Sequence, residues 1–392
     1  MGSAVVNDSI YLDYAATAPL HPAASRAVQA GQSLVGNPSS AHGAGRAAAA
    51  ALQDARRSIA SMLGTSPGEI VLTSGGSESN TLALWGTFAA RRFSGHLVTT
   101  SIEHSSILEN ASALAELGVS VTFVDPQPSG HVDAGDVGAA MRPDTALVSV
   151  MHANNETGAV QPIALIAAAT RAAGVPFHTD AVHTAGKLDI AAVGAEMISV
   201  SAHKFGGPRG VGALAVRTGN RLAPVIRGGS QEDGQRAGTE NVAGVMGMAA
   251  AADVCRDRIS GAYRAHVHNL RNRLIAGLYG IGGVHINATD PIVAETIGVR
   301  FDGIRADTLA DALDLQDIYV STGSACHARK DRKNRVSHVL TAQGLTEEQS
   351  RSAVRFSLGS DVTAEDIDRV VSATCAAVDR LRRTAGRQAV LQ

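Results

Sequence analysis

The sequence of 392 residues has few cysteines, few aromatic residues and no long hydrophobic run. Aromatic side chains make up only 3% of the chain, which argues against a row of rings that stacks nucleic-acid bases. The longest weakly polar stretch, residues 242–252, is far shorter than the ~20 residues of a membrane span. The first ten residues contain no basic region followed by an apolar run, so they predict no signal peptide. These absences predict a soluble, cytoplasmic protein without a membrane partner.

The three cysteines, Cys255, Cys326 and Cys375, stand too far apart for a zinc or iron–sulfur motif. We therefore expect no metal site and a reducing compartment. The 34 basic and 36 acidic residues give a net charge of −2, which excludes a surface that is basic throughout. A local basic patch that approaches nucleic acid stays compatible with this balance.

Short apolar runs alternate with helical patterns from about residue 45 onward. This alternation predicts crossover units that build a largely parallel sheet with helices on both faces. In such sheets ligands bind beyond the carboxyl ends of the strands. The runs that predict strands are residues 70–72, 97–98, 119–124, 146–151, 175–177, 197–200 and 212–216, with helices at 107–117 and 163–173 among them.

The pattern changes after residue 240. A long helical region is expected at 240–280, with Thr239 as its N-cap, because threonine oxygens accept hydrogen bonds from the first free N–H groups. Shorter, mixed elements follow at 297–301, 318–321 and 353–358, and a last helix at 364–383. This region predicts a smaller α+β domain.

Lysine is the scarcest charged residue and therefore the most informative one. The chain has Lys187, Lys204, Lys330 and Lys333, and the other 30 of its 34 basic residues are arginine. Lys204 follows the strand predicted at 197–200, close to the ligand-binding edge of the sheet. An amine can lose its proton and form an imine with a carbonyl, which a guanidinium cannot do. A single lysine at a strand end is more often an ordinary surface residue, so this interpretation needs support from its neighbours.

Two other strand ends supply that support. The segment Thr73-Ser74-Gly75-Gly76-Ser77 precedes a helix expected from Glu78, and glycines at such a turn let backbone N–H groups surround a phosphate. Asp180 ends the run that starts at Val175, although an acid there is by itself more often an N-cap. A phosphate cradle, an imine-forming lysine and a lone carboxylate together are what pyridoxal phosphate requires.

Five segments carry a family resemblance. They are Thr73-Ser74-Gly75-Gly76-Ser77-Glu78, Met151-His152-Ala153-Asn154-Asn155-Glu156, Ser201-Ala202-His203-Lys204, Arg236-Ala237-Gly238-Thr239 and Ser321-Thr322-Gly323-Ser324-Ala325-Cys326. The chain resembles the cysteine desulfurases, the pyridoxal-phosphate enzymes of aminotransferase class V that remove sulfur from L-cysteine. The similarity runs from the segment at Tyr11 to about Arg382, nearly the whole chain.

The resemblance implies an α/β protein of pyridoxal-phosphate fold type I that forms a homodimer. A large domain with a mixed, mainly parallel sheet is expected at residues 16–260, and a smaller α+β domain at 1–15 plus 261–392. Lys204 is implied to form an imine with the cofactor, Asp180 to pair with its ring nitrogen, and His104 to stack on the ring and transfer protons. The other implied contacts are Gly76, Ser77, Ser201 and His203 to the phosphate, Thr239 to the neighbouring subunit's cofactor, Asn155 to the ring hydroxyl and substrate, and Arg355 to the substrate carboxylate.

Cys326 differs from the other two cysteines in its surroundings. Cys255 and Cys375 lie on predicted helices, where a small thiol is usually part of the core. The segment after Cys326 carries five basic side chains and one acidic one, Asp331, and positive charge lowers the pKa of a thiol. In the implied reaction, the Lys204 amine removes the α-proton of cysteine and the Cys326 thiolate takes the sulfur as a persulfide. Alanine then leaves, and the sulfur passes to an acceptor.

Two features depart from the family pattern. His183 stands where relatives carry glutamine, so it either donates to the ring hydroxyl and adds a pH dependence, or simply packs against its neighbours. Residues 327–338 form a longer and more basic segment than in relatives. Its basic residues, which run from Arg329 to Arg335, predict docking of an acidic acceptor protein, with an approach to nucleic acid as the alternative.

Several functional alternatives stay open at this point. Iron–sulfur assembly, tRNA thiolation and DNA phosphorothioation are all compatible destinations for the sulfur. A selenocysteine lyase or another β-eliminating enzyme would also keep Lys204 and Asp180. In a different class, the chain would be a docking subunit of a modification complex that retains the fold without catalysis.

Overall fold

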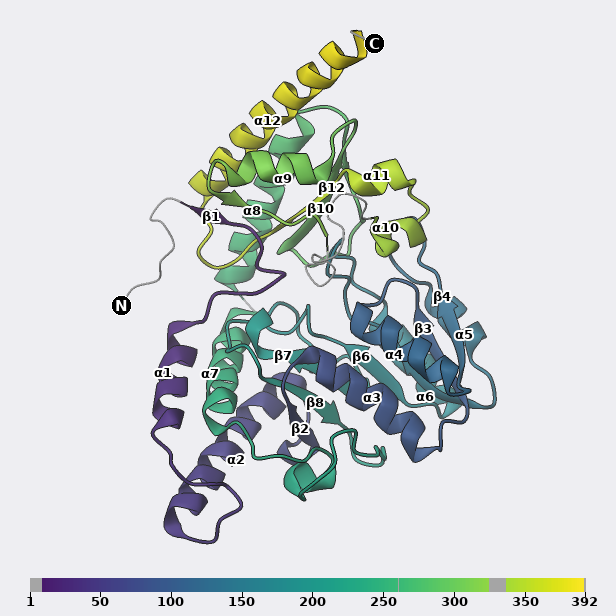
Figure 1. Cartoon of the computed structure of the whole chain (residues 1–392), viewed down its shortest axis with the longest axis vertical. Coiled ribbons are helices and arrows are strands. Elements are labelled where there is room, and N and C mark those ends of the chain that lie inside the picture. Colours follow the sequence, from purple (N-terminus) through teal and green to yellow (C-terminus); the bar gives the residue numbers. More distant parts are fainter. Residues whose placement is uncertain (1–8, 260, 324–335, 391–392) are drawn as a thin grey trace.

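The computed structural model describes residues 9–259, 261–323 and 336–390. A lower part contains the large sheet, and an upper part contains both ends of the described chain (Figure 1). The long helix α12 (Ala364–Val390) projects from the top of the upper part.

The large sheet has seven strands in the order β2-β8-β7-β6-β5-β3-β4. Every strand runs in the same direction except β8, which is antiparallel to both of its neighbours. The carboxyl ends of β2, β6 and β7 therefore meet at one edge of the sheet. The strands are β2 (Ile70–Thr73), β3 (His96–Thr100), β4 (Ser120–Val124), β5 (Thr145–Ser149), β6 (Phe177–Asp180), β7 (Met197–Ser201) and β8 (Gly212–Val216).

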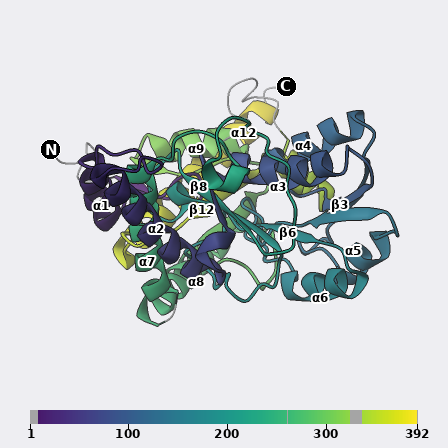
Figure 2. The same cartoon turned by 90° about the horizontal axis from the view of Figure 1, so that it is seen from below.

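Helices cover both faces of this sheet (Figure 2). On one face α3 and α4 bury side chains such as Phe88 and Leu114 against the strands. On the other face α2, α5, α6 and α7 bury side chains such as Leu52, Ile166 and Met248. The lower part also contains α1 and three short 3₁₀ turns, and its helical elements are α1 (Pro22–Gln32), α2 (Gly43–Leu63), α3 (Gly76–Ala90), α4 (Ser105–Glu116), α5 (Ala134–Ala140), α6 (Ile163–Ala173), α7 (Val242–Arg258), η1 (Pro67–Glu69), η2 (Ala202–Lys204) and η3 (Gln231–Gly234).

The upper part has its own core around an antiparallel sheet of order β12-β10-β9. Side chains from the beginning of the chain, such as Leu12, pack there with side chains from its end, such as Phe356. The division into domains at 16–260 and at the two chain ends stays a prediction. The elements are β1 (Ile10–Tyr11), β9 (Val284–Ile286), β10 (Thr296–Phe301), β11 (Ile318–Tyr319), β12 (Ala353–Ser357), α8 (Ala262–Tyr279), α9 (Ala306–Asp314), α10 (His338–Ala342), α11 (Glu347–Arg351) and α12.

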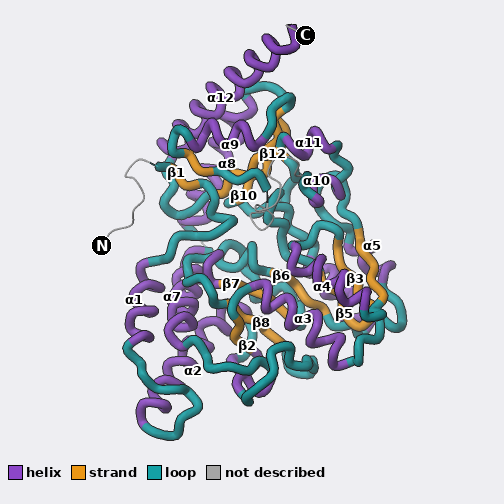
Figure 3. The backbone as a smooth tube through the Cα atoms, in the orientation of Figure 1, coloured by secondary structure: helices purple, strands orange, loops and turns teal. Residues whose placement is uncertain are grey.

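The N-terminal segment connects the two parts (Figure 3). Strand β1 pairs with β11 in the upper part, and the Ser357 hydroxyl bonds both the Leu12 carbonyl (3.1 Å) and the Ala15 amide (3.0 Å). A few residues later, the Ala18 amide donates to the carbonyl of His203 in the lower part, at 2.9 Å. The chain between β1 and α1 therefore passes directly beside the residue that precedes Lys204.

Most of the predicted elements are confirmed. Helix α6 covers the predicted range of 163–173, and Gly64 ends α2 in the left-handed conformation (φ 63°) that favours glycine. Helix α3 begins at Gly76 rather than at Glu78, which places Ser77 in its first turn. Strand β6 begins after Pro176, a residue that has no N–H group to donate. No helix in the described ranges combines the length and apolar character that a membrane span needs.

The prediction for residues 240–280 is wrong in two respects. The region forms two helices, because α7 ends at Arg258 and α8 begins only after Gly261, whose φ of 94° breaks the helical path. The N-cap of α7 is Asn241, whose side-chain oxygen accepts from the Gly244 amide at 3.0 Å. Thr239 lies in the exposed loop before it. Asparagine stands next to the first helical residue, and that position decides the cap.

Candidate functional site

Glycines shape the turn between β2 and α3. Gly75 has a φ of 155°, and a Cβ atom on Gly76 would lie 2.6 Å from the Val182 side chain. A Cβ atom on Gly212 of β8 would lie 2.6 Å from the Gly75 Cα atom. Only glycine therefore fits where the backbone of β8 approaches the turn. The first amides of α3, which have no intrahelical partner, can surround an anion at this point, with Ser77 in the first turn and the buried Ser201 nearby.

An ion pair fastens a second loop to this turn. Glu78 accepts from the Ser74 amide at 2.7 Å and from Arg236 Nε at 2.8 Å. The loop that contains Arg236 also contains Thr239, which is exposed in the single chain. The predicted contact of Thr239 with a neighbouring subunit's cofactor stays a prediction.

Asp180 is held at the carboxyl end of β6 with only 6% of its surface exposed. One carboxylate oxygen accepts from the Val182 amide at 2.9 Å, and the other accepts from Asn80 Nδ2 at 2.7 Å. The same amide nitrogen donates to Ser106 Oγ at 2.8 Å, and Ser106 Oγ lies 2.8 Å from His104 Nδ1. Asp180 and His104 are therefore connected through two residues that sequence reasoning missed. Asn80 lies one helical turn after Gly76, and this spacing is the signal that could have identified it.

Lys204 ends the 3₁₀ turn that follows β7, the neighbour of β6 in the sheet. Its Nζ atom donates to the carbonyls of Ala15 (2.7 Å) and Ala16 (3.1 Å) in the N-terminal segment. The Nδ1 atom of the adjacent His203 lies 3.2 Å from Thr17 Oγ1, and burial lowers the pKa of His203 to about 4. The His203 imidazole is therefore neutral near pH 7 and can donate one hydrogen bond to an anion.

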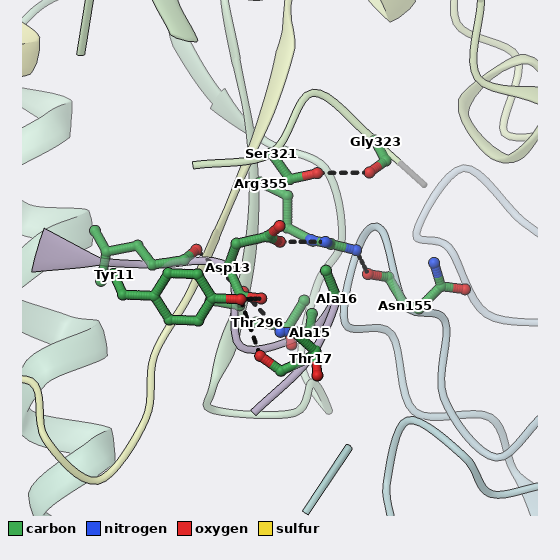
Figure 4. A network of polar contacts seen from close by, with 12 residues as sticks. Tyr11, Asp13, Ala15, Ala16, Thr17, Asn155, Thr296, Ser321, Gly323 and Arg355 are labelled. Atoms are coloured by element: carbon green, nitrogen blue, oxygen red, sulfur yellow. Dashed lines mark hydrogen bonds and ion pairs between the residues drawn. The ribbon is translucent and has the colours of Figure 1, made fainter. Parts of the chain in front are cut away.

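Arg355 is at the centre of a polar network between the two parts (Figure 4). Nη2 donates to Asp13 Oδ1 at 2.7 Å, and Nη1 donates to the Asn155 carbonyl at 2.8 Å. Nε is buried and has no partner among the described residues. The guanidinium, which is 3% exposed as a residue, therefore keeps donor capacity for a carboxylate. Asp13 was not predicted as a site residue, because a separation of 342 positions hides its pairing with Arg355.

These residues fit pyridoxal phosphate. The glycine turn offers amides to a phosphate, the Asp180 carboxylate is oriented by two donors, and Lys204 supplies an amine at the adjacent strand end. The site brings together Gly76, Ser77, His104, Asp180, Ser201, His203 and Lys204 around one edge of the sheet, and Asn155, His183 and Arg355 lie where the upper part meets it.

Comparisons with known proteins identify the family. The sequence matches the family "Aminotransferase class-V" over residues 10–370. It is 41% identical over 387 residues to the "IscS-like cysteine desulfurase" of Mycobacterium tuberculosis, and the match covers 96% of this chain and 98% of that protein. The chain belongs to the cysteine desulfurase family.

Solved structures of such proteins share the fold. A "NifS-like protein" superimposes with a TM-score of 0.88 at 33% identity, covering 95% of this chain and all (100%) of the other. A structure described as "SspA in complex with cysteine" gives a TM-score of 0.79 at 37% identity and covers 89% and 99% of the two chains. The predicted fold type I, with its mixed and mainly parallel sheet, is therefore confirmed.

His183 is the site residue that is expected to depart from the family pattern. Its Nε2 atom lies 3.0 Å from Thr296 Oγ1, and its buried Nδ1 atom has no partner in the described part of the chain. Burial, with help from the charges of Lys187, Lys204 and Arg355, lowers the pKa of His183 well below 6.5. The imidazole is therefore neutral near pH 7 and adds no titration there. Its unpartnered nitrogen fits a polar group such as a ring hydroxyl.

The structure describes the surroundings of two of the three cysteines, Cys255 and Cys375. Cys255 is 4% exposed, and burial raises the pKa of its thiol to about 11, which confirms the prediction of an inert core residue. Cys375 on α12 is only partly buried, so the prediction of a core thiol is too strong there. Cys326 and the basic segment from Arg329 to Arg335 lie outside the described residues.

Proposed function

We propose that the protein is a homodimeric, cytoplasmic, pyridoxal-phosphate-dependent enzyme that converts L-cysteine to L-alanine and holds the sulfur as a persulfide on Cys326. The observation that supports this most directly is the position of Lys204 beside Asp180, at the sheet edge that also carries the glycine turn. Glycine turns and strand-end lysines are each common. Their combination with an oriented carboxylate is what the cofactor requires.

Different residues would bind the phosphate and the ring of the cofactor. Gly76, Ser77, Ser201 and His203 would bind its phosphate, together with the partner subunit's Thr239. Asp180 would pair with the ring nitrogen, His104 would stack on the ring, and Asn155 and His183 would face the ring hydroxyl. When bound, the cofactor supplies an electron-accepting ring that makes the α-proton of the amino acid acidic.

The protein's own residues would carry the remaining steps. Arg355 binds the substrate carboxylate through N–H groups that Asp13 and Asn155 leave available. The Lys204 amine takes the α-proton and later returns a proton. The Cys326 thiolate attacks the substrate sulfur, so that a sulfur–sulfur bond forms and the carbon–sulfur bond breaks. The electron pair of the broken bond stays on the substrate carbon, which takes up a proton and leaves in alanine.

An acceptor protein would then take the persulfide sulfur. We propose that it docks at the basic segment from Arg329 to Arg335 with an acidic surface of its own. Replacement of the five basic residues should reduce sulfur transfer to the acceptor and spare alanine formation. Equal loss of both would contradict docking at this segment.

Two substitutions and one control test the proposed reaction. The Lys204→Ala variant should lose the visible absorbance of the lysine-bound cofactor, and persistence of that absorbance without added amine would refute the role of Lys204. The Cys326→Ser variant should keep the absorbance but form neither a persulfide nor sulfide. The control, Cys375→Ser, removes the partly exposed thiol on α12 and should turn over cysteine normally. Normal turnover by the Cys326→Ser variant would exclude Cys326 as the sulfur carrier.

A further inference from the structure

Lys187, which is partly buried, and Glu295, which is buried, are charged residues that have no role in the reaction proposed above. Lys187 follows His183 by four positions, and its Nζ atom donates to the His183 carbonyl at 2.7 Å. Glu295 is 6% exposed and directly precedes Thr296, which contacts the His183 ring. Two consecutive residues of the upper part thus face two residues of one turn in the lower part.

Both residues line a cavity of about 320 Å³ that also reaches Lys204. Cys255, Tyr263 and Arg258 contribute to its walls, whereas neither the glycine turn nor Asp180 does. Among the predicted cofactor contacts, only Lys204 lines this cavity. It places one basic and one acidic side chain near the amine on which the proposed reaction depends.

The groups around Lys187 and Glu295 determine which charges act there. Lys204 and Arg355 repel a proton on Lys187, Glu295 attracts it, and burial is the largest influence, which lowers the pKa of Lys187 to about 8. Burial raises the pKa of Glu295, and the positive charges of Lys187 and Arg264 oppose this shift. Burial raises the pKa of Cys255 to about 11 and also raises that of Tyr263, and His183 is neutral. Cys255, Tyr263 and His183 are therefore uncharged near pH 7. The acidic and basic side chains that line the cavity with Lys204 are Lys187, Arg258, Glu295 and Asp361, together with His21, whose pKa burial lowers.

The contacts of Lys204 itself act against its role as a base. The carbonyls of Ala15 and Ala16 accept hydrogen bonds from Nζ and favour its charged form. An amine must be neutral to attack an aldehyde or to take a proton. A second ammonium ion in the same poorly solvated cavity disfavours the charged form, because like charges repel strongly where the effective dielectric constant is low.

We infer that Lys187 and Glu295 are positioning residues for the reaction, which set the electric field at the Lys204 nitrogen with opposite signs. The Lys187 ammonium disfavours a proton on this nitrogen, and the Glu295 carboxylate limits that effect. This inference rests on the proposed function, since the proposed reaction requires the Lys204 amine to be neutral. It adds two residues that are not themselves among the predicted cofactor contacts and that lie outside the segments on which the family resemblance rests.

The experiment is a pH titration of the visible absorbance of the cofactor-loaded protein. The Lys187→Met variant should shift the titration midpoint upward by on the order of one pH unit, a size typical of one neighbouring charge. The Glu295→Gln variant should shift it downward. Lys187→Arg, which keeps the positive charge, should titrate like the wild type. Asp368→Asn serves as the control for Glu295→Gln, since it removes a carboxylate that is exposed and paired with Arg273 on the surface.

The opposite signs separate a field effect from damage to the structure. A distortion of the site would move both variants in one direction or leave both midpoints unchanged, and either result would overturn the inference. The Glu295→Gln variant removes the buried carboxylate itself. Its titration can therefore be measured even if Lys187→Met, which leaves that carboxylate without the Lys187 charge, does not fold. Absence of a Lys204-dependent band in the wild type would instead contradict the proposed function, which keeps the two failures distinct.

Discussion

At the residue scale, the Asp180 carboxylate depends on a side chain from another element for its orientation. Asn80 on α3 uses its two amide hydrogens to bind Asp180 at 2.7 Å and Ser106 at 2.8 Å. Asn80 is 1% exposed and Asp180 is 6% exposed, so water has little access to replace a lost donor. A buried acceptor that loses its partner keeps the full cost of desolvation.

We therefore expect Asn80→Ala to bind pyridoxal phosphate about tenfold more weakly, since a hydrogen bond to a charged group contributes about 1.5–3 kcal/mol. Dialysis against graded cofactor concentrations, followed by absorbance, measures the affinity. The matched control is Asn110→Ala on α4, because Asn110 donates to Thr81 and to the Ser106 carbonyl without touching Asp180. Equal affinities for both variants would contradict a role of Asn80 in orienting the carboxylate.

Glu103, next to His104, is a second buried group with an unusual environment. Its exposed fraction is 0%, and Oε1 accepts from Thr100 Oγ1 at 2.7 Å and from the Met151 amide at 2.9 Å. Oε2 has no partner in the described part of the chain. Burial raises the pKa of this carboxyl group from 4.5 to about 8. The folded protein therefore keeps a proton on Glu103 at pH values where the unfolded chain has released it.

This shift predicts a pH-dependent gain in stability for Glu103→Gln. Because the pKa is raised in the folded state, the wild type loses free energy of unfolding as the pH rises from 4.5 to about 8. The loss is on the order of 1 kcal/mol per pH unit within that window, and glutamine does not share it. Thermal unfolding at pH 5.5 and pH 8.5 should show that the stability of Glu103→Gln relative to the wild type is greater at the higher pH. The exposed Glu109→Gln on α4 is the control, and a pH-independent difference for Glu103→Gln would refute the assignment.

The sequence alone identifies the site residues that stand at strand ends and misses those that act through them. Lys204 and Asp180 were predicted because each stands within four residues of the end of an apolar run. Asp13 was not predicted, since its partner Arg355 lies on a distant segment and no local pattern records the pairing. His183 could be recognised as unusual, but its neutrality follows from burial, which only the folded chain reveals.

At the scale of elements, α10 is fastened to the lower part at its first turn. Ser337 caps this helix by accepting from the Leu340 amide at 3.2 Å, and its hydroxyl donates to Glu156 Oε2 at 2.5 Å. His338 Nε2 lies 3.0 Å from the carbonyl of Glu103, beside His104. Helix α10 follows Cys326 in the sequence, and these contacts hold its first turn near His104.

Ser337→Ala should therefore slow persulfide formation several-fold, in addition to losing about 1 kcal/mol of stability as an N-cap. Thr346→Ala is the matched control, because Thr346 caps the short helix α11 at the Gln349 amide and makes no hydrogen bond to the lower part among the described residues. The temperature of thermal unfolding should fall similarly for both variants. The rate of persulfide labelling in a single turnover should fall only for Ser337→Ala. A parallel loss of labelling in both would assign the effect to stability alone.

The order of elements could be predicted because apolar periodicity and glycine positions are local signals. Helix α6 and the end of α2 at Gly64 follow such signals closely. The break between α7 and α8 was missed, since the apolar pattern continues across Gly261 and only its φ of 94° interrupts the path. The antiparallel direction of β8 was also not predicted, because an apolar run of five residues carries no information about its direction.

At the scale of the whole molecule, the loop that contains Thr239 has the character of a contact surface. Val225 and Ile226, which lie between β8 and α7 as Thr239 does, are 42% and 41% exposed. Large apolar side chains exposed close together in sequence are typical of surfaces that another chain covers. We therefore expect a homodimer in which this loop completes the partner's phosphate site.

A mixed dimer tests this arrangement directly. Lys204→Ala abolishes a subunit's own site, whereas Thr239→Ala should weaken only the site of the neighbouring subunit. In a dimer of one Lys204→Ala chain and one Thr239→Ala chain, the second chain has both its own Lys204 and an intact Thr239 opposite. This hybrid should therefore show about half the alanine formation of the wild type at limiting cofactor, because one of its two sites is complete. Both parent homodimers should be defective under the same conditions, and a hybrid no better than their average would place Thr239 in its own subunit's site or in none.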